Sequence, residues 1–249
     1  MEELERIVLE VLSDGSARRL SELETLTMRA LGKPIKDETV YKDAIAALQS
    51  RRLVTLTGQE VRRSEPDFPE RDLEPPVEAY LASDAAFAQL GFNRDFTVWQ
   101  KTARGGRAGT GTWSRPDFTI ATIRRRKYDP VRHLDLVAFE LKNLAGSTVV
   151  AVHEALAHTR FAHYAFLVCP RSALNAGVQS AIRDSCAQHG IGLLTFDLGV
   201  GREQTPALKG FNIEVDARRK SPEPDLVDSY IDDRFDEENR GRLIRLSGG

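Results

Sequence analysis

The stretch VAFELKNLAG, residues 137–146, begins as an apolar run that two charged residues, Glu140 and Lys142, interrupt at alternate positions. Alternate side chains of a strand share one face, so these two charges point the same way. A charged side chain that leaves water without a partner costs several kcal/mol. The pattern therefore predicts a buried strand whose charged pair is held by something else in the fold.

A second carboxylate, Asp117 in SRPDFTIATI, precedes Glu140 by 23 residues. It is expected to begin a strand whose partner, across RRRKYDPVRH, is the strand of Glu140. Two neighbouring strands joined in this way bring Asp117 and Glu140 together at one end. Paired carboxylates suit a hard divalent cation, with oxygen ligands about 2.1 Å away for magnesium. Lys142, on the same face, can then orient a water and stabilise charge that builds on a phosphate.

Pro116-Asp117 and Glu140-Leu141-Lys142, each half on a strand, resemble the PD-(D/E)xK nuclease superfamily and its restriction-endonuclease-like core. The resemblance extends over the order of elements in about residues 77–196. It implies that Asp117, Glu140 and the backbone carbonyl of Leu141 bind Mg²⁺, with Mn²⁺ also accepted. It further implies that Lys142 positions or activates the attacking water.

The same resemblance implies two catalytic residues on helices. Glu78, in PPVEAYL, matches a glutamate that often contributes from the first core helix. Glu154, in the helix after the motif, stands where members of the superfamily commonly carry a glutamine. The other interpretation of the whole constellation is a structural ion pair between Glu140 and Lys142, with Asp117 as a turn residue.

The first 63 residues are expected to form a winged helix-turn-helix domain, a layout that resembles Mrr-like restriction enzymes when it precedes the nuclease core. Apolar spacing predicts helices over 2–12, over 21–31 and from near Asp37, followed by a short hairpin around Gly58 and Gln59. Such a domain docks DNA or makes protein contacts, and the acidic third helix leaves both interpretations open. The basic residues available for DNA here are Lys42, Arg51, Arg52, Arg62 and Arg63.

The rest of the chain is divided by composition and by alternating elements. Residues 64–76 hold four prolines and five acids, which predicts a linker. Residues 77–200 are expected to form an α/β core, a mixed sheet flanked by helices, and 201–249 a C-terminal extension with a loose end. Strands are expected near 95–101, 117–123, 134–142, 164–169, 191–196 and 211–215, and helices over about 77–90, 149–163, 172–189 and 223–235.

Two further basic segments lie in the core region. The glycine-rich stretch 103–113 is expected to be a loop beside the site, where Arg104 and Arg107 can contact phosphates. The run Arg124, Arg125, Arg126 and Lys127 lies on the connector between the two motif strands. Its expected closeness to the site favours a clamp on the DNA backbone over a solvated turn.

Composition limits the remaining classes of protein. Net charge is −2, yet residues 77–200 carry 14 basic and 10 acidic side chains, so positive charge concentrates around the motif. Two cysteines cannot build a disulfide framework, no apolar run spans a bilayer, and the acidic start is not a targeting peptide, so a cytoplasmic protein is expected. His153 and His158 in HEALAH are five apart and point in different directions, so this is not a zinc-protease motif.

These patterns together favour a metal-dependent nuclease that acts on DNA, with a restriction, defence or repair role implied by the resemblance. A homodimer is expected because cutting both strands usually takes two active sites. The alternative is a non-catalytic DNA-binding or regulatory protein built on a nuclease-like core.

Overall fold

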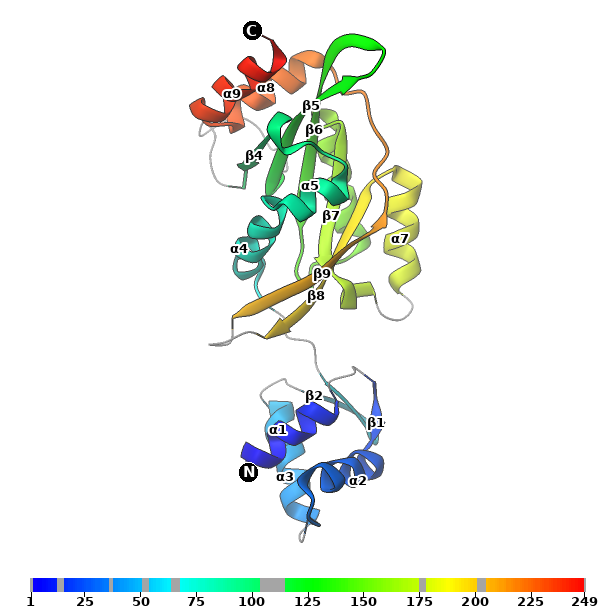
Figure 1. Ribbon diagram of the computed structural model, residues 1–249. Coiled ribbons are helices and arrows are strands. Elements are labelled where there is room, and N and C mark those ends of the chain that lie inside the picture. The colour runs from blue at the N-terminus through cyan, green and yellow to red at the C-terminus, as the bar shows by residue number, and fades with distance from the viewer. Residues whose placement is uncertain are drawn as a thin grey trace. The chain divides into compact units, whose positions relative to one another are not determined.

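The chain folds into two compact units, Met1–Pro66 and Asp67–Gly249 (Figure 1). A computed structural model describes residues 2–12, 16–35, 38–50, 54–63, 68–103, 115–174, 178–200 and 205–248. Each unit has its own hydrophobic core. In the part of the chain that is described, no helix has both the length and the apolarity needed to cross a membrane.

The N-terminal unit combines three helices with a small antiparallel sheet of strand order β1-β3-β2. The predicted hairpin around Gly58 and Gln59 is confirmed, and Gly58 takes a φ of +63° that favours glycine in the tight turn. The helices form because apolar residues recur at helical spacing and meet in one core. The elements are α1 (Glu2–Val11), β1 (Arg18–Arg19), α2 (Leu20–Leu31), α3 (Glu38–Ser50), β2 (Val54–Thr57) and β3 (Glu60–Arg63).

The C-terminal unit is built on a mixed six-stranded sheet of order β4-β5-β6-β7-β8-β9, as expected for an α/β core. Strands β6, β7 and β8 run parallel, while β4, β5 and β9 pair antiparallel with their neighbours. The strands are β4 (Thr97–Lys101), β5 (Phe118–Arg126), β6 (Asp129–Leu141), β7 (Tyr164–Pro170), β8 (Gly192–Val200) and β9 (Pro206–Val215). The helices are α4 (Glu70–Leu81), α5 (Asp84–Leu90), α6 (Val149–Ala157), α7 (Val178–His189), α8 (Pro224–Arg234) and α9 (Glu237–Ser247).

Helices cover both faces of this sheet (Figure 1). One core lies between the sheet and α4 and α5, and the other between the sheet and α6, α7, α8 and α9. Alternation along the strands decides which residues face which side. Phe118 of β5 and Phe139 of β6 face α4, whereas Ala121 and Ala138 face α6.

The predicted linker over 64–76 is wrong for its second half, because α4 begins at Glu70 and runs through Pro75 and Pro76. Proline removes a backbone donor and ordinarily breaks a helix. Here Leu73, Val77 and Leu81 lie four residues apart and are fully buried against the sheet. Burial of such side chains contributes about 1.5–3 kcal/mol each, which offsets the cost of the prolines.

The C-terminal segment is not an extension of the core but a part of it. Strand β9 is an edge strand of the sheet. Helices α8 and α9 bury Val227 and Leu243 in the core on one face of the sheet. The end that was expected to be loose forms α9, whose first turn is capped when Asp236 accepts the N–H of Asn239. The sequence did not predict this helix because it is mostly polar. Its few apolar residues stabilise it only by packing against the sheet.

Candidate active site

The register of β5 and β6 places Asp117 next to Glu140. Phe118 opposes Phe139, and the residue before it, Asp117, donates its N–H to the carbonyl of Phe139 at 2.9 Å. Alternation then puts the side chain of Asp117 on the face of Thr119, which is also the face of Glu140. Both carboxylates therefore lie at the same end of two neighbouring strands, on the side that α6 covers.

Asp117 is tied to the motif of the neighbouring strand by one hydrogen bond. Its Oδ2 accepts the backbone N–H of Leu141 at 2.7 Å, so its carboxylate lies beside the backbone between Glu140 and Lys142. Burial, and then the negative charge of Glu140, raise the pKa of Asp117 to about 7. The N–H of Leu141 and the charge of Lys142 offset only part of that rise.

Glu140 is bonded through both of its carboxylate oxygens. Oε1 accepts from Nζ of Lys142 at 2.6 Å, and Oε2 lies 2.8 Å from Nε2 of the fully buried His158. Burial alone would raise the pKa of Glu140, but His158 and then Lys142 lower it below its usual value. His153 points elsewhere, with its ring 5.4 Å from that of His189, so HEALAH does not present two histidines to one site.

Lys142 lies among three carboxylates. Besides Glu140, its Nζ contacts Oε2 of Glu154 on α6 at 3.0 Å and Oε2 of Glu70 on α4 at 3.7 Å. Burial would lower the pKa of Lys142, but its bond to Glu140 and the charges around it raise the pKa above its usual value. The ammonium therefore stays protonated throughout the neutral range and acts as a fixed positive charge.

The carboxylate that α4 brings to Lys142 is Glu70 and not Glu78, the residue named from the sequence. Glu78 lies two turns further along α4, where its Oε2 is 3.5 Å from Nζ of Lys101. Glu74 holds the same lysine at 2.6 Å. Glu70 was missed because the prolines of this segment concealed the first turns of α4. Its spacing of four and eight residues from Glu74 and Glu78 was the signal that could have found it.

Oxygen ligands for Mg²⁺ are available at this site. Within the described residues no three His, Cys, Asp or Glu side chains form a ready-made metal site. However, Mg²⁺ is usually held by only one or two carboxylates together with waters. The mutual repulsion of Asp117 and Glu140 would be relieved by a cation near both. The residues present therefore fit Mg²⁺, with Asp117, Glu140 and the carbonyl of Leu141 as the groups that would hold it.

A chain of hydroxyl groups supports the Asp117 turn from α8, and the sequence did not reveal it. Thr102 Oγ1 donates to the carbonyl of Pro116 at 2.8 Å, which leaves Thr119 Oγ1 to donate to Thr102 at 3.1 Å. Tyr230 completes the chain by donating to Thr119 Oγ1 at 2.6 Å. The residue before Asp117 is thus held by a tyrosine more than 100 positions away in the sequence.

The basic run at the end of β5, residues 124–127, lies away from the carboxylates. Strand β5 has nine residues, and at about 3.3 Å per residue its two ends are roughly 25–30 Å apart. Arg124 contacts Oδ2 of Asp135 through Nε at 2.9 Å, and Lys127 lies 5.0 Å from the ring of Tyr128. The expected closeness of this run to the site was wrong, because a hairpin that joins two long strands lies at their opposite end.

The other predicted DNA contacts are only partly described. Lys42 is exposed on α3. The backbones of four arginines are placed but their side chains are not described, namely Arg62, Arg63, Arg125 and Arg126. Four more lie outside the described residues, namely Arg51, Arg52, Arg104 and Arg107.

Comparison with known proteins assigns no family. No family model matches the chain, and no curated protein matches it. Among solved structures it is similar to that of the restriction endonuclease FokI, with 10% sequence identity and a TM-score of 0.22. The alignment covers 77% of this chain and 41% of that one. A TM-score this low does not assign a fold.

Proposed function

We propose that this protein is a metal-dependent nuclease that hydrolyses phosphodiester bonds in DNA. The observation that carries the proposal is the meeting of Asp117 and Glu140 at one end of two neighbouring strands, with Lys142 bonded to Glu140. Two carboxylates beside a fixed ammonium suit a reaction in which a cation and a phosphate must be held together.

In this proposal Asp117, Glu140 and the carbonyl of Leu141 hold the ion. Bound Mg²⁺ or Mn²⁺ supplies Lewis-acid stabilisation of the phosphate and a more acidic water. Lys142 serves as a cation because its raised pKa keeps it protonated. It orients the attacking water and stabilises charge that develops at phosphorus.

Two glutamates from different helices hold Lys142 in place. Glu154 of α6 contacts its Nζ at 3.0 Å, and Glu70 of α4 lies at 3.7 Å. Because both are partly exposed, their contribution is to direct the ammonium rather than to stabilise the fold. Glu78 pairs instead with Lys101 at the end of β4 and has no part in this arrangement.

The N-terminal unit is proposed to be a winged helix-turn-helix domain that docks DNA. The order of helix, strand, two helices and hairpin in this unit supports that proposal, and its sequence supplies positive charge through Lys42, Arg51, Arg52, Arg62 and Arg63. A restriction, defence or repair endonuclease acting as a homodimer fits this arrangement, since each chain carries one carboxylate pair.

One observation favours the alternative, a non-catalytic DNA-binding protein on a nuclease-like core. Both oxygens of Glu140 are already bonded, to Lys142 and to His158, so the buried charge is balanced without a metal. A closed network of this kind can serve structure alone. The two functions predict different responses to metal.

The test is cleavage of supercoiled and linear duplex DNA with Mg²⁺, with Mn²⁺ and with a chelator. Asp117→Asn and Glu140→Gln should abolish metal-dependent cleavage. Glu214→Gln is the matched control, because it removes an ion-paired carboxylate from β9, an edge strand that β7 and β8 separate from β6. Binding of DNA without cleavage under any metal would establish the alternative.

A further inference from the structure

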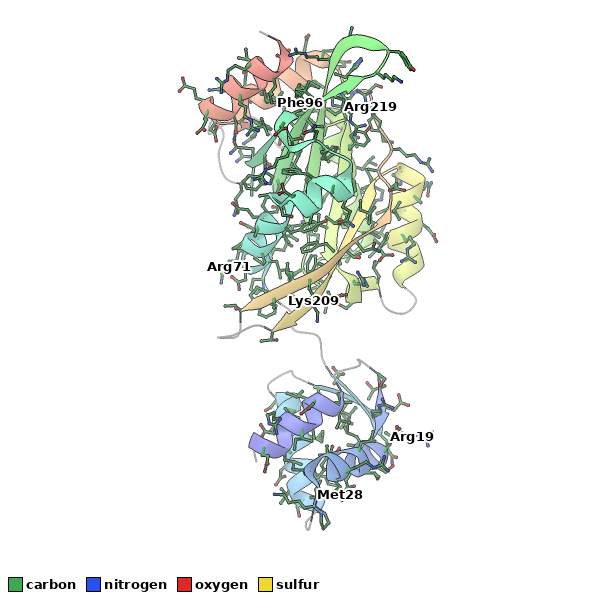
Figure 2. All side chains as sticks on the ribbon, in the orientation of Figure 1. Arg19, Met28, Arg71, Phe96, Lys209 and Arg219 are labelled. Atoms are coloured by element: carbon green, nitrogen blue, oxygen red, sulfur yellow. The ribbon has the colours of Figure 1, made fainter. Side chains whose placement is uncertain are left out.

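A second site lies at the other end of the C-terminal unit, beneath the β5–β6 hairpin. A cavity of about 410 Å³ opens there between the segment after α5, the hairpin and the segment after β9. Figure 2 labels Phe96 and Arg219, two of its lining residues, near this end of the sheet. The volume lies within the roughly 300–1,000 Å³ that is usual for small-molecule sites.

This cavity is separate from the carboxylate cluster. Its floor includes Thr122 and Asp135, which oppose each other in the sheet. They lie five residues along their strands from Asp117 and Glu140, which corresponds to about 17 Å. Alternation also places them on the α4 and α5 side of the sheet, whereas Glu140 faces α6. A ligand in the cavity therefore does not touch the proposed catalytic residues.

The described side chains that line the cavity carry net positive charge. Asp135 is the one acidic residue among them and is 1% exposed. That carboxylate lies between two guanidinium groups, with Arg124 Nε 2.9 Å from Oδ2 and Arg219 Nε 2.9 Å from Oδ1. Nearby, His163 is neutral because its Nδ1 accepts the N–H of Leu136, and burial and then the two arginines lower its pKa despite Asp135. One carboxylate thus balances only one of two permanent positive charges.

Arg124 contacts two aromatic rings and one carboxylate. Its guanidinium lies 5.7 Å from the ring centre of Phe92 and 5.2 Å from that of Tyr164, and both rings line the cavity. Asp135 engages it through Nε, so its two terminal amino groups are not used in that bond. A planar guanidinium fixed between rings and a carboxylate is suited to bind a phosphate through two parallel hydrogen bonds.

We propose that this cavity binds a phosphate-bearing ligand of mononucleotide size, with the phosphate on Arg124 and Arg219 and the planar base against Phe96. A free nucleotide and a nucleotide within a DNA strand both carry this combination of a phosphate ester and a planar aromatic base. Because the cavity faces away from Asp117 and Glu140, the free nucleotide is the source that the geometry favours.

The test is calorimetric titration of the full chain in a chelating buffer, which keeps it independent of any nuclease activity. The probes are adenosine monophosphate, inorganic phosphate, adenosine and a single-stranded hexanucleotide. We expect adenosine monophosphate to bind more tightly than phosphate or adenosine, and its binding, unlike that of the hexanucleotide, to depend on Arg124. Arg124→Gln should weaken that binding about 10- to 100-fold, as expected for lost hydrogen bonds to a charged group.

Arg132→Gln is the matched control, since it removes an exposed arginine of the same hairpin that does not line the cavity, and it should leave binding unchanged. If Arg124→Gln does not fold, Arg124→Lys replaces it, because lysine keeps the charge beside Asp135 but loses the planar fork. Absence of binding by the wild-type chain at millimolar adenosine monophosphate overturns the proposal. Equal losses in Arg124→Gln and Arg132→Gln also overturn it. Hexanucleotide binding that is tighter than that of adenosine monophosphate and is weakened by Arg124→Gln assigns the cavity to a DNA strand.

Discussion

Asp117 accepts the backbone N–H of Leu141 at 2.7 Å, and this bond joins the two halves of the motif across neighbouring strands. The carboxylate is thereby held beside Glu140, whose charge contributes to the raised pKa of Asp117. Two carboxylates are thus kept close to each other, and their mutual repulsion is a free-energy cost that the charge of Lys142 and a bound cation can offset.

Lys142→Ala should retain metal binding and lose most cleavage. Its ammonium makes no bond to the ion in the proposed mechanism, and removal of one such electrostatic contribution typically costs about 10²–10³ in rate. Magnesium titration beside a cleavage assay measures both effects. Lys101→Ala is the matched control, since that lysine also pairs with glutamates of α4 but does not contact Glu140. Cleavage at the wild-type rate would remove Lys142 from the mechanism, and unfolding of Lys142→Ala would identify the pair as structural.

The metal-free protein should lose stability relative to Asp117→Asn as pH rises from about 4 to about 7. The folded-state pKa of Asp117 is raised from 3.8 to about 7, so its contribution is complete below pH 4 and is lost as the folded carboxyl ionises. At about 1.4 kcal/mol per pKa unit, the difference in unfolding free energy should change by at most about 4.5 kcal/mol. Urea unfolding in chelator at several pH values measures it.

Glu214→Gln is the control for that series, because hydrogen bonding by Asn212 and other groups lowers the pKa of Glu214. The carboxylate of Glu214 stabilises the fold above its unfolded-state pKa, and this stabilisation is lost as pH falls. The stability of the wild type relative to Glu214→Gln should therefore increase as pH rises, opposite to the change relative to Asp117→Asn. A flat difference between wild type and Asp117→Asn over the same range contradicts the raised pKa.

His158→Ala should destabilise the fold by about 2–5 kcal/mol. His158 is fully buried, and its loss removes one of the two partners of the buried carboxylate of Glu140 and leaves a cavity. Chemical denaturation measures the change. His153→Ala, on the exposed side of α6, should stay within about 0.5 kcal/mol of the wild type. Equal effects of the two substitutions would mean that His158 does not support Glu140.

Tyr230→Phe should lower stability by about 1–2 kcal/mol and weaken magnesium binding. The hydroxyl begins the hydrogen-bond chain through Thr119 and Thr102 to the carbonyl before Asp117, and its removal leaves that buried chain without its first donor. Tyr128→Phe, on a residue that is 88% exposed, is the control and should change neither quantity. Unaltered magnesium affinity in Tyr230→Phe would limit the tyrosine to packing.

Local pattern alone was sufficient to place the strands that carry the motif. The period of two along residues 137–142 set Glu140 and Lys142 on one face, and the hairpin connection set Asp117 opposite Glu140. Both inferences depend on contacts between neighbouring residues or neighbouring strands, and these are encoded within a short stretch of chain. The interleaved order of the elements likewise predicted a mixed sheet flanked by helices.

Only the tertiary structure decided which residues from distant segments complete the site. Glu70 reaches Lys142 because α4 forms despite its two prolines. The free energy from burying one face of this helix exceeds the cost of the prolines, and local helix propensity does not include that burial. Tyr230 reaches Thr119 because α8 packs on the sheet, and Arg124 lies far from Asp117 because long strands separate the hairpin from the site. The sequence by itself determined that Asp117 and Glu140 meet at one end of two neighbouring strands. Packing between segments far apart in the chain determined which residues surround them.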